Sequence, residues 1–375
     1  MPKTCSDSVA PAARRTLHGP TMGTRWSVTL DGQPALDGDA LQRELAAAVQ
    51  QVDDQMSPWK PTSDLVRLNR APVGTWVELP PRILAVLTRA LEIARLSGGA
   101  FDPTVGALVD AWGFGEEREQ PDPAAIQVAR SATAAAGHTR LELDLAAGRA
   151  RKHAALQVDL CGIAKGYAVD RMAAVLQRHG AAHALIALDG ELRAPGPQAD
   201  GQPWAVALES HVPGRRAAHG VIELQDLAVA TSGDYRRFWD VGEARLAHTM
   251  DPRRAAPLHN AVASVTVLAR DCMDADAWPQ RCWWRVTAMG WPWLHAWAWK
   301  PCTCCVATSG WWNWDWAASP RRQPTPAAPD RCASADCARA VPYQLQLTAP
   351  DHSRRKPSCV KSRHINQPPT QGVTP

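Results

Sequence analysis

Cysteine is scarce in the first part of this 375-residue chain, where only Cys5, Cys161 and Cys272 precede residue 277. Three widely spaced thiols cannot build a disulfide framework, so the sequence excludes a small scaffold held together by several bridges. Long apolar runs are also missing. The first 19 residues, MPKTCSDSVAPAARRTLHG, lack the apolar core of a signal peptide. No stretch approaches the roughly 20 apolar residues of a membrane helix. As written, the sequence predicts a cytoplasmic protein without a transmembrane segment, unless an earlier start codon encodes an export signal.

A strong charge of either sign is absent as well. The net charge is +4 and 21% of the residues are charged, which argues against a dedicated nucleic-acid surface.

The composition is uneven along the chain. Ten of the 17 Trp lie between Trp283 and Trp316, seven of the 10 Cys follow Asp276, and 13 of the 31 Pro follow Trp278. Beyond Trp278 no helical or strand period persists, and the last segments have the composition of disordered sequence. We therefore expect a flexible N-terminus at 1–15, a folded body at 16–278 and an aberrant, disordered tail at 279–375.

The body alternates between helical and strand patterns, which predicts an α+β fold with antiparallel hairpins and packed helices. The predicted helices span 39–56, 80–97 and 165–180. The predicted strands lie at 24–30, 183–190, 203–210, 221–233 and 262–269, with two more in 140–160 joined at Ala147-Gly148.

Four segments place polar residues where turns meet strands or helices: 19–24 (GPTMGT), 97–115, 158–170, and 247–252 followed by 271–278. Taken singly, each has a structural explanation. Gly98-Gly99 is typical of a helix C-cap, and Phe101 of a core residue. Asp159 fits an N-cap, and Asp274 fits a carboxylate that complements a helix dipole. His248 alone indicates a structural histidine as readily as a base.

Lys165 is the exception, because a cation at the start of a helix opposes the helix dipole. Its position is favourable if it faces an anionic ligand that the free N–H groups of the helix also attract. Carboxylates such as Asp276 and a backbone carbonyl suit a hard cation such as Mg²⁺. Together these groups supply what phosphoryl transfer requires: charge neutralisation, positioning and a base for the attacking hydroxyl.

The ordered motifs TMGT, AFDPTVG, VDLCGIAKGYAVD, SGDY, HTMDP and DADAW resemble the ApbE-type FAD:protein FMN transferases over residues 17–278. The resemblance implies Mg²⁺-dependent transfer of FMN from FAD to a threonine of a target flavoprotein, with release of AMP. Two alternatives remain open: an FAD pyrophosphatase, or an inactive FAD-binding remnant whose C-terminal core has been lost. Members of the family are often exported, which favours the periplasm if the start codon is misplaced.

The resemblance also implies roles for individual residues. It makes His248 the base and Asp276 a catalytic metal-binding residue. The implied metal ligands are the Gly162 carbonyl, Asp276 and Gln280. The implied FAD contacts are Met22, Trp59, Ala100, Phe101, Asp102, Asp159, Lys165 and Met250.

Three positions depart from the family pattern. Cys161 replaces a serine, Asp189 stands where a glycine pair begins, and Gln280 replaces a threonine four residues after Asp276. Residues i and i+4 share a helix face, so a short hydroxyl at 280 would complete the metal shell. Glutamine offers a carbonyl oxygen from a longer and less fixed side chain.

The tryptophans of the tail have an explanation in the genetic code. Trp has the single codon TGG, so Trp-Trp in a shifted frame gives Leu, Val or Met followed by Val. With G/C-rich codons, residues 279–301 can be reread as TAALLVAGDGDGLALAARLGLEA, which restores a threonine and an Ala/Leu-rich helix. We hypothesise a frameshift between the codons for Trp278 and Gln280. A tryptophan ligand platform or a cysteine metal site in the tail would need periods and spacings that are missing.

Overall fold

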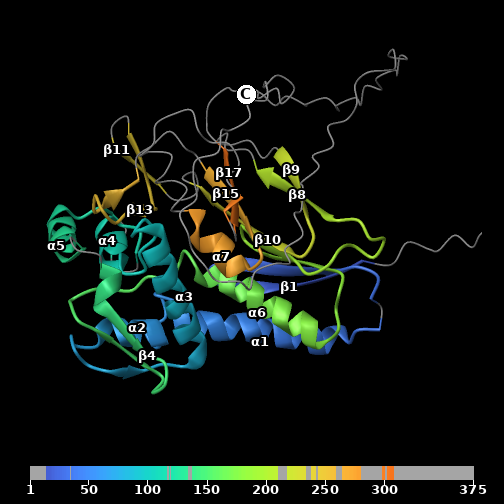
Figure 1. Cartoon of the computed structure of the whole chain (residues 1–375), viewed down its shortest axis with the longest axis horizontal. Coiled ribbons are helices and arrows are strands. Elements are labelled where there is room, and N and C mark those ends of the chain that lie inside the picture. The colour runs from blue at the N-terminus through green and yellow to red at the C-terminus, as the bar shows by residue number, and fades with distance from the viewer. Residues whose placement is uncertain are drawn as a thin grey trace, which may run out of the picture. The chain divides into compact units, whose positions relative to one another are not determined.

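The computed structural model describes residues 14–33, 35–115, 118, 120–133, 137–209, 218–233, 238–241, 244–258, 264–279, 298–299 and 302–307. These residues form helices that pack on antiparallel sheets, which confirms the predicted α+β class (Figure 1).

The helical elements are α1 (Gly38–Met56), α2 (Asp64–Arg70), α3 (Pro81–Ser97), α4 (Gly106–Ala111), α5 (Pro123–Thr133), the 3₁₀ turn η1 (Gly137–Arg140), α6 (Ala164–Arg178) and α7 (Cys272–Ala277). The strands of the main sheet are β1 (Arg15–Thr21), β2 (Thr24–Leu30), β6 (Ala184–Leu188), β7 (Glu191–Ala194), β10 (Leu227–Gly233), β15 (Ser264–Ala269), β17 (Cys302–Ala307) and β16 (Ala298–Trp299). The smaller sheets contain β3 (Val77–Glu78), β4 (Leu141–Asp144), β5 (Arg149–Lys152), β8 (Trp204–Glu209), β9 (Ala218–Leu224), β11 (Phe238–Val241), β12 (Ala244–Ala247), β13 (Met250–Asp251) and β14 (Ala256–Pro257).

The main sheet runs in the order β1-β2-β6-β7-β10-β15-β17-β16, and each strand is antiparallel to its neighbours. Successive side chains of a strand point to opposite faces, so both faces need a cover. In β10, Ala228 and Ala230 join the large core beneath the helices, whereas Val229 joins a smaller core with Trp204 of β8. Helices α1, α6 and α7 therefore cover one face, and the β8–β9 hairpin covers the other.

The helices form where an apolar stripe has a good cap. In α1, Leu41, Leu45 and Val49 recur at helical spacing and are buried, and the Asp37 carboxylate accepts hydrogen bonds from two N–H groups of the first turn. Helix α3 ends at Ser97 and is capped by Gly98. The φ of Gly98 is 66°, which is the left-handed conformation that the predicted C-cap requires. Helices α1 and α6 lie side by side across the sheet (Figure 1).

Three boundaries differ from the sequence prediction. Strand β1 begins at Arg15, inside the segment expected to be a flexible N-terminus. The predicted strand 221–233 is two strands, β9 and β10, separated at Asp226, whose φ is 53°. In the tail expected to be disordered, β17 pairs with β15 and β16 pairs with β17.

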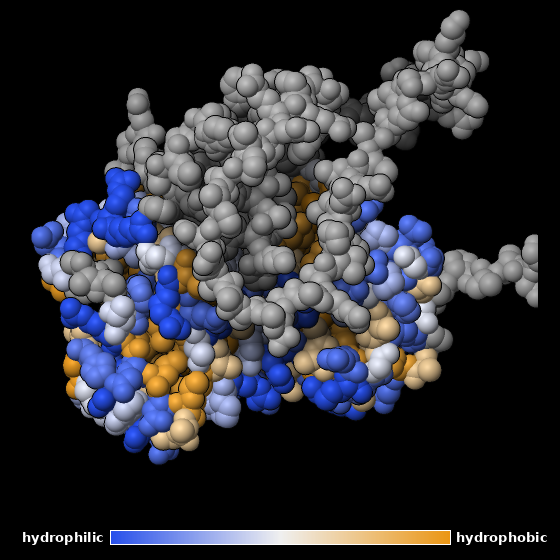
Figure 2. All heavy atoms as spheres, viewed as in Figure 1, coloured by the Kyte–Doolittle hydropathy of each residue, from blue (hydrophilic) through white to orange (hydrophobic). Residues whose placement is uncertain are grey.

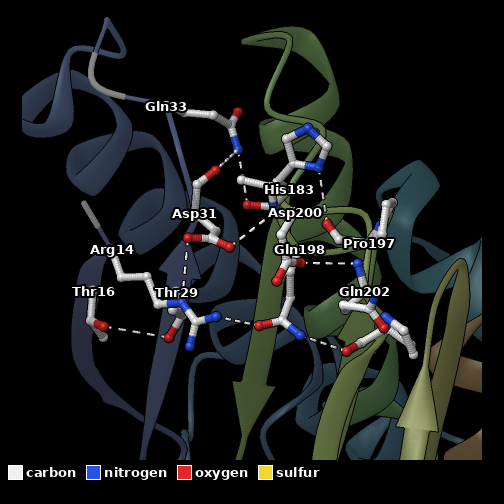
Figure 3. Close-up of polar contacts among 12 residues, drawn as sticks. Arg14, Thr16, Thr29, Asp31, Gln33, His183, Pro197, Gln198, Asp200 and Gln202 are labelled. Carbon is white, nitrogen blue, oxygen red and sulfur yellow. Dashed lines mark hydrogen bonds and ion pairs between the residues drawn. The ribbon is translucent and has the colours of Figure 1, made fainter. Parts of the chain in front are cut away.

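The connection from the main sheet to the β8–β9 hairpin is fixed by polar contacts (Figure 3). The Asp31 carboxylate accepts hydrogen bonds from Arg14 Nε at 3.3 Å and from the backbone N–H of Ala199 at 2.9 Å. The Gln198 side-chain amide donates to the carbonyl of Pro203 at 2.6 Å. These contacts hold the segment that leads into β8 against the end of β2.

Hydrophilic residues predominate on the described surface of one face of the molecule, with small apolar patches between them (Figure 2). Exposed apolar side chains are ordinary on the surface of a folded protein. Within the described part of the chain, every helix is too short or too polar to cross a bilayer.

Candidate functional site

One cavity of about 1080 Å³ lies between the helices, the main sheet and the β8–β9 hairpin. It is lined by ten of the residues that the sequence singled out: Met22, Trp59, Phe101, Asp102, Asp159, Gly162, Lys165, His248, Met250 and Asp276. Ala100 is buried next to the cavity wall and does not line it. Gln280 lies outside the described residues. Segments far apart in the sequence therefore meet at one site.

Met22 reaches the cavity from the tip of the β1–β2 hairpin. Thr21 pairs with Thr24, which leaves Met22 and Gly23 as the two central residues of the turn. Their φ values are 45° and 69°. Positive φ at both central residues matches the type I′ turn that suits the twist of a two-residue hairpin. Glycine adopts this conformation freely, but methionine is strained in it, as residues at functional sites often are.

Lys165 lies in the first turn of α6 and is surrounded by carboxylates. Its Nζ is 2.7 Å from Glu191 Oε1 and 3.5 Å from Asp189 Oδ2. These partners explain how a cation is tolerated at a helix N-terminus. Burial and the charge of Asp276 raise the pKa of Glu191 to about 8, although Lys165 opposes this shift.

Asp276 is buried on α7, and three contacts fix this short helix. The backbone N–H of Gly166 donates to Asp276 Oδ2 at 2.9 Å. Arg89 of α3 binds both carboxylate oxygens of Asp274 at 2.7 Å, so Asp274 does more than complement the helix dipole. The Asp170 carboxylate of α6 accepts hydrogen bonds from the N–H groups of Cys272 and Met273 at 2.9 Å. Together these contacts set the position of Asp276 on α7.

The turn that contains Asp159 and Gly162 is held from two sides. The Asn69 side chain of α2 donates to the carbonyl of Val158 at 2.9 Å and accepts from its N–H at 2.7 Å. The N–H of Asp159 donates to the carbonyl of Pro103 at 2.7 Å. The Asp159 carboxylate accepts from the N–H of Cys161 at 2.7 Å.

Asp159 and Cys161 have different roles in this turn. Asp159 caps the turn itself, because the N-cap of α6 is Ile163; the interpretation of Asp159 as the helix N-cap was wrong. Burial raises the pKa of the Cys161 thiol well above its usual value, so the cysteine that replaces a serine remains a neutral thiol.

Asp102 lines the cavity, but its carboxylate is already engaged. Oδ1 accepts from the N–H of Thr104 at 2.9 Å and from its hydroxyl at 2.6 Å. Oδ2 lies 2.9 Å from His138 Nδ1 and also accepts from the N–H of His138. Burial favours a higher pKa for Asp102, but the contacts with His138 and Thr104 outweigh it and lower the pKa. Asp102 thus ties the loop before α4 to η1.

Aromatic and thioether side chains form the remaining part of the wall around α2 and α4. Trp59 is 47% exposed at the cavity, whereas Phe101 is 3% exposed and belongs to the core as well. Met250 packs in a separate small core with Phe114. His248 lies edge-on to Phe114, with ring centroids 6.3 Å apart. These side chains offer flat, polarisable surfaces of the kind that bind ring systems.

The donor set suits Mg²⁺ when a substrate supplies further ligands. Asp159, Asp276 and the Gly162 carbonyl are hard oxygen donors that line the same cavity. Among the described residues, no three or more His, Cys, Asp or Glu side chains form a cluster that could hold a metal ion by themselves. Mg²⁺ commonly binds through one or two carboxylates together with substrate phosphates and water, so these residues fit it.

The sequence interpretation gave no role to Glu191 and treated Asp189 only as a departure from a glycine pair. Both flank Lys165 in the folded chain. The only signal for Glu191 was its place directly after the Asp189-Gly190 turn, at the first position of β7. His138 had no such signal, because its partner Asp102 is 36 residues away.

Comparison with known proteins identifies the family of the chain. Residues 22–294 match the model of the ApbE family, so the match extends beyond Trp278. The FAD:protein FMN transferase of Vibrio cholerae is 37% identical over 270 residues, covering 71% of this chain and 80% of that protein. The one from Haemophilus influenzae is 36% identical, covering 70% of this chain and 78% of that protein.

Solved structures agree in fold. The flavin transferase ApbE from Vibrio cholerae superimposes with a TM-score of 0.65 at 36% identity, covering 72% of this chain and 86% of that one. The apo flavinyl transferase ApbE of Pseudomonas stutzeri has a TM-score of 0.65 at 32% identity, covering 73% and 85% of the two chains. The motifs, the fold and the family match together show that this chain belongs to the ApbE family.

Proposed function

We propose that the chain transfers FMN from FAD to a threonine hydroxyl of a target flavoprotein and releases AMP, with Mg²⁺ as cofactor. The observation that carries the proposal is that Lys165, Asp276 and His248 line one cavity of about 1080 Å³. This volume lies just above the roughly 300–1,000 Å³ range of small-molecule sites, which suits a large ligand such as a dinucleotide. The names of the curated relatives support FAD as the substrate and a protein as the acceptor.

Different residues of the cavity bind different parts of the substrate. Lys165 supplies a positive charge and α6 supplies N–H groups, which together attract a pyrophosphate. Trp59, Phe101 and Met22 offer apolar and aromatic surface to a ring system. When bound, Mg²⁺ would be held by Asp276 and the Gly162 carbonyl and would neutralise charge on the phosphates.

In the reaction, His248 accepts the proton of the acceptor hydroxyl, and the hydroxyl oxygen forms a bond to the FMN phosphorus. The bond from that phosphorus to the bridging oxygen breaks, and AMP leaves with the electron pair. Lys165 stabilises the negative charge on the phosphates while this happens.

The test mixes purified protein, FAD and MgCl₂ with and without a target flavoprotein. The expected result is covalent flavin on a threonine of the target, read by mass spectrometry, with one AMP released for each flavin attached. AMP release that proceeds equally without a target would instead indicate FAD hydrolysis. Retention of FAD without AMP release would indicate a flavin-binding remnant. We expect the His248→Ala variant to bind FAD with wild-type affinity and to lose the transfer.

A further inference from the structure

Asp189 adopts a left-handed backbone conformation that is uncommon for residues other than glycine. Leu188 pairs with Glu191 in the β6–β7 hairpin, so Asp189 and Gly190 are the central residues of the turn. Asp189 has a φ of 54°. Glycine adopts such a conformation without strain, whereas a residue with a Cβ adopts it at a cost. Residues in such conformations cluster at functional sites, and Asp189 lines the ligand cavity, which raises the question of what its carboxylate does there.

The strained turn places a carboxylate at the phosphate-binding lysine. Asp189 Oδ2 is 3.5 Å from Lys165 Nζ, and both residues line the cavity. The same ammonium group is 2.7 Å from Glu191, whose side chain is 3% exposed. Lys165 is therefore engaged by the protein itself and is not reserved for a ligand.

The balance of charge around Lys165 is unfavourable to an anion. Asp189 lies 3.5 Å from the Lys165 ammonium group, Asp276 adds a second carboxylate to the same cavity, and the buried Glu191 adds a third acidic side chain. Partly buried charges interact several times more strongly than charges in water. A pyrophosphate that enters this wall without a cation meets net repulsion.

We propose that Asp189 makes FAD binding conditional on a divalent cation. Its carboxylate pairs with the Lys165 ammonium group until a bound cation neutralises the negative charge of the surrounding carboxylates. The inference rests on the proposed function. Asp189 is the residue that stands where the family pattern has the first glycine of a pair. By thermodynamic linkage, FAD must strengthen the binding of the cation by the same factor as the cation strengthens the binding of FAD.

The experiment measures the Kd of FAD by calorimetry at constant ionic strength, once in EDTA and once in saturating MgCl₂. Asp189→Asn removes the charge, and Asp189→Gly removes both the charge and the backbone strain. In both variants we expect FAD to bind about tenfold more tightly in EDTA than it binds the wild type, as expected for removing one nearby unit charge. The Kd in MgCl₂ is expected to change by less than about twofold, so the ratio of the two Kd values falls.

Asp226→Asn is the matched control. Asp226 is also an aspartate at positive φ in a turn, but it lies outside the cavity lining and accepts a hydrogen bond from the N–H of Gly196. Its substitution is expected to leave both Kd values unchanged. Thermal unfolding establishes that each variant is folded.

The outcomes separate the two proposals. A wild-type protein that binds no FAD even in MgCl₂ contradicts the proposed function. A wild-type protein that binds FAD, with both Asp189 variants keeping its Kd in EDTA or binding more weakly, overturns the role of Asp189 alone. A change in the Asp226→Asn control equal to that of the Asp189 variants would also overturn it.

Discussion

Replacing Gly166 with alanine tests whether close contact between α6 and α7 sets the position of Asp276. A Cβ at this position would lie 2.2 Å from the carbonyl oxygen of Cys272 and 2.8 Å from Asp276 Cβ. Ordinary contacts begin at 3.4 Å, so α7 would have to retreat by about 1 Å. Ala275 and Ala277 of α7 are completely buried, which leaves little room for that movement.

The cost follows from three contributions. Overpacking of a core contact costs about 1–3 kcal/mol. Loss of the hydrogen bond from the N–H of Gly166 to the Asp276 carboxylate costs about 1.5–3 kcal/mol. Alanine regains about 1 kcal/mol through its better helix propensity. The free energy of unfolding should therefore fall by about 3 kcal/mol, which lowers the Tm by roughly 6–12 °C for a domain of this size.

Calorimetry measures the Tm, and FAD titration in MgCl₂ measures the loss of affinity that accompanies a displaced Asp276. Gly220→Ala is the control, because a Cβ there meets no atom within 4 Å. We expect the control to match the wild type in both measurements. A Gly166→Ala protein with wild-type Tm and wild-type dependence on MgCl₂ would refute the reasoning, because the close approach of the two helices would then be irrelevant.

Three other predictions concern the same site. Because burial raises the pKa of Glu191 from 4.5 to about 8, its contribution to stability is complete below about pH 4.5 and is lost as the pH rises through 8. In EDTA, the free energy of unfolding of Glu191→Gln should fall less than that of the wild type between roughly pH 5 and 9. Urea unfolding measures both values at each pH, and an equal fall in the two proteins would disprove this. Arg89→Ala leaves the Asp274 carboxylate buried without its partner and should cost about 2–4 kcal/mol by urea unfolding, with part of the loss recovered in Arg89→Ala/Asp274→Asn. Trp59→Ala should weaken FAD binding at least about tenfold with little change in Tm. Leu145→Ala should change neither, because Leu145 is also exposed (58% against 47% for Trp59) but lies outside the cavity lining.

Periodicity was enough to predict the three long helices and several strands, whereas the helices α2, α4 and α5 were not predicted. The spacing of Leu41, Leu45 and Val49 predicts α1 because a helix repeats every 3.6 residues, and the alternation of Trp26, Val28 and Leu30 predicts β2. The same reasoning does not place the break at Asp226, because both strands around it are apolar and only the turn conformation separates them.

Part of the site was predicted from the resemblance to the ApbE-type transferases. That resemblance assigned Lys165, His248 and Asp276 to one site, and the three residues line one cavity in the structure. The partners that fix these residues were not predictable, because they are set by tertiary packing. Arg89 and Asp274 are 185 residues apart, and no local pattern joins them.

The pairing of β17 with β15 has a consequence for how this protein tolerates change. The outer edge of β15 offers backbone N–H and C=O groups, and residues 302–307 meet them in register from Ser264↔Ala307 to Leu268↔Thr303. Such groups recognise an extended main chain and do not distinguish one side chain from another. The edge of β15 is thus an unselective acceptor. A segment whose sequence has changed can still pair with it, provided that its backbone is extended and free to form hydrogen bonds.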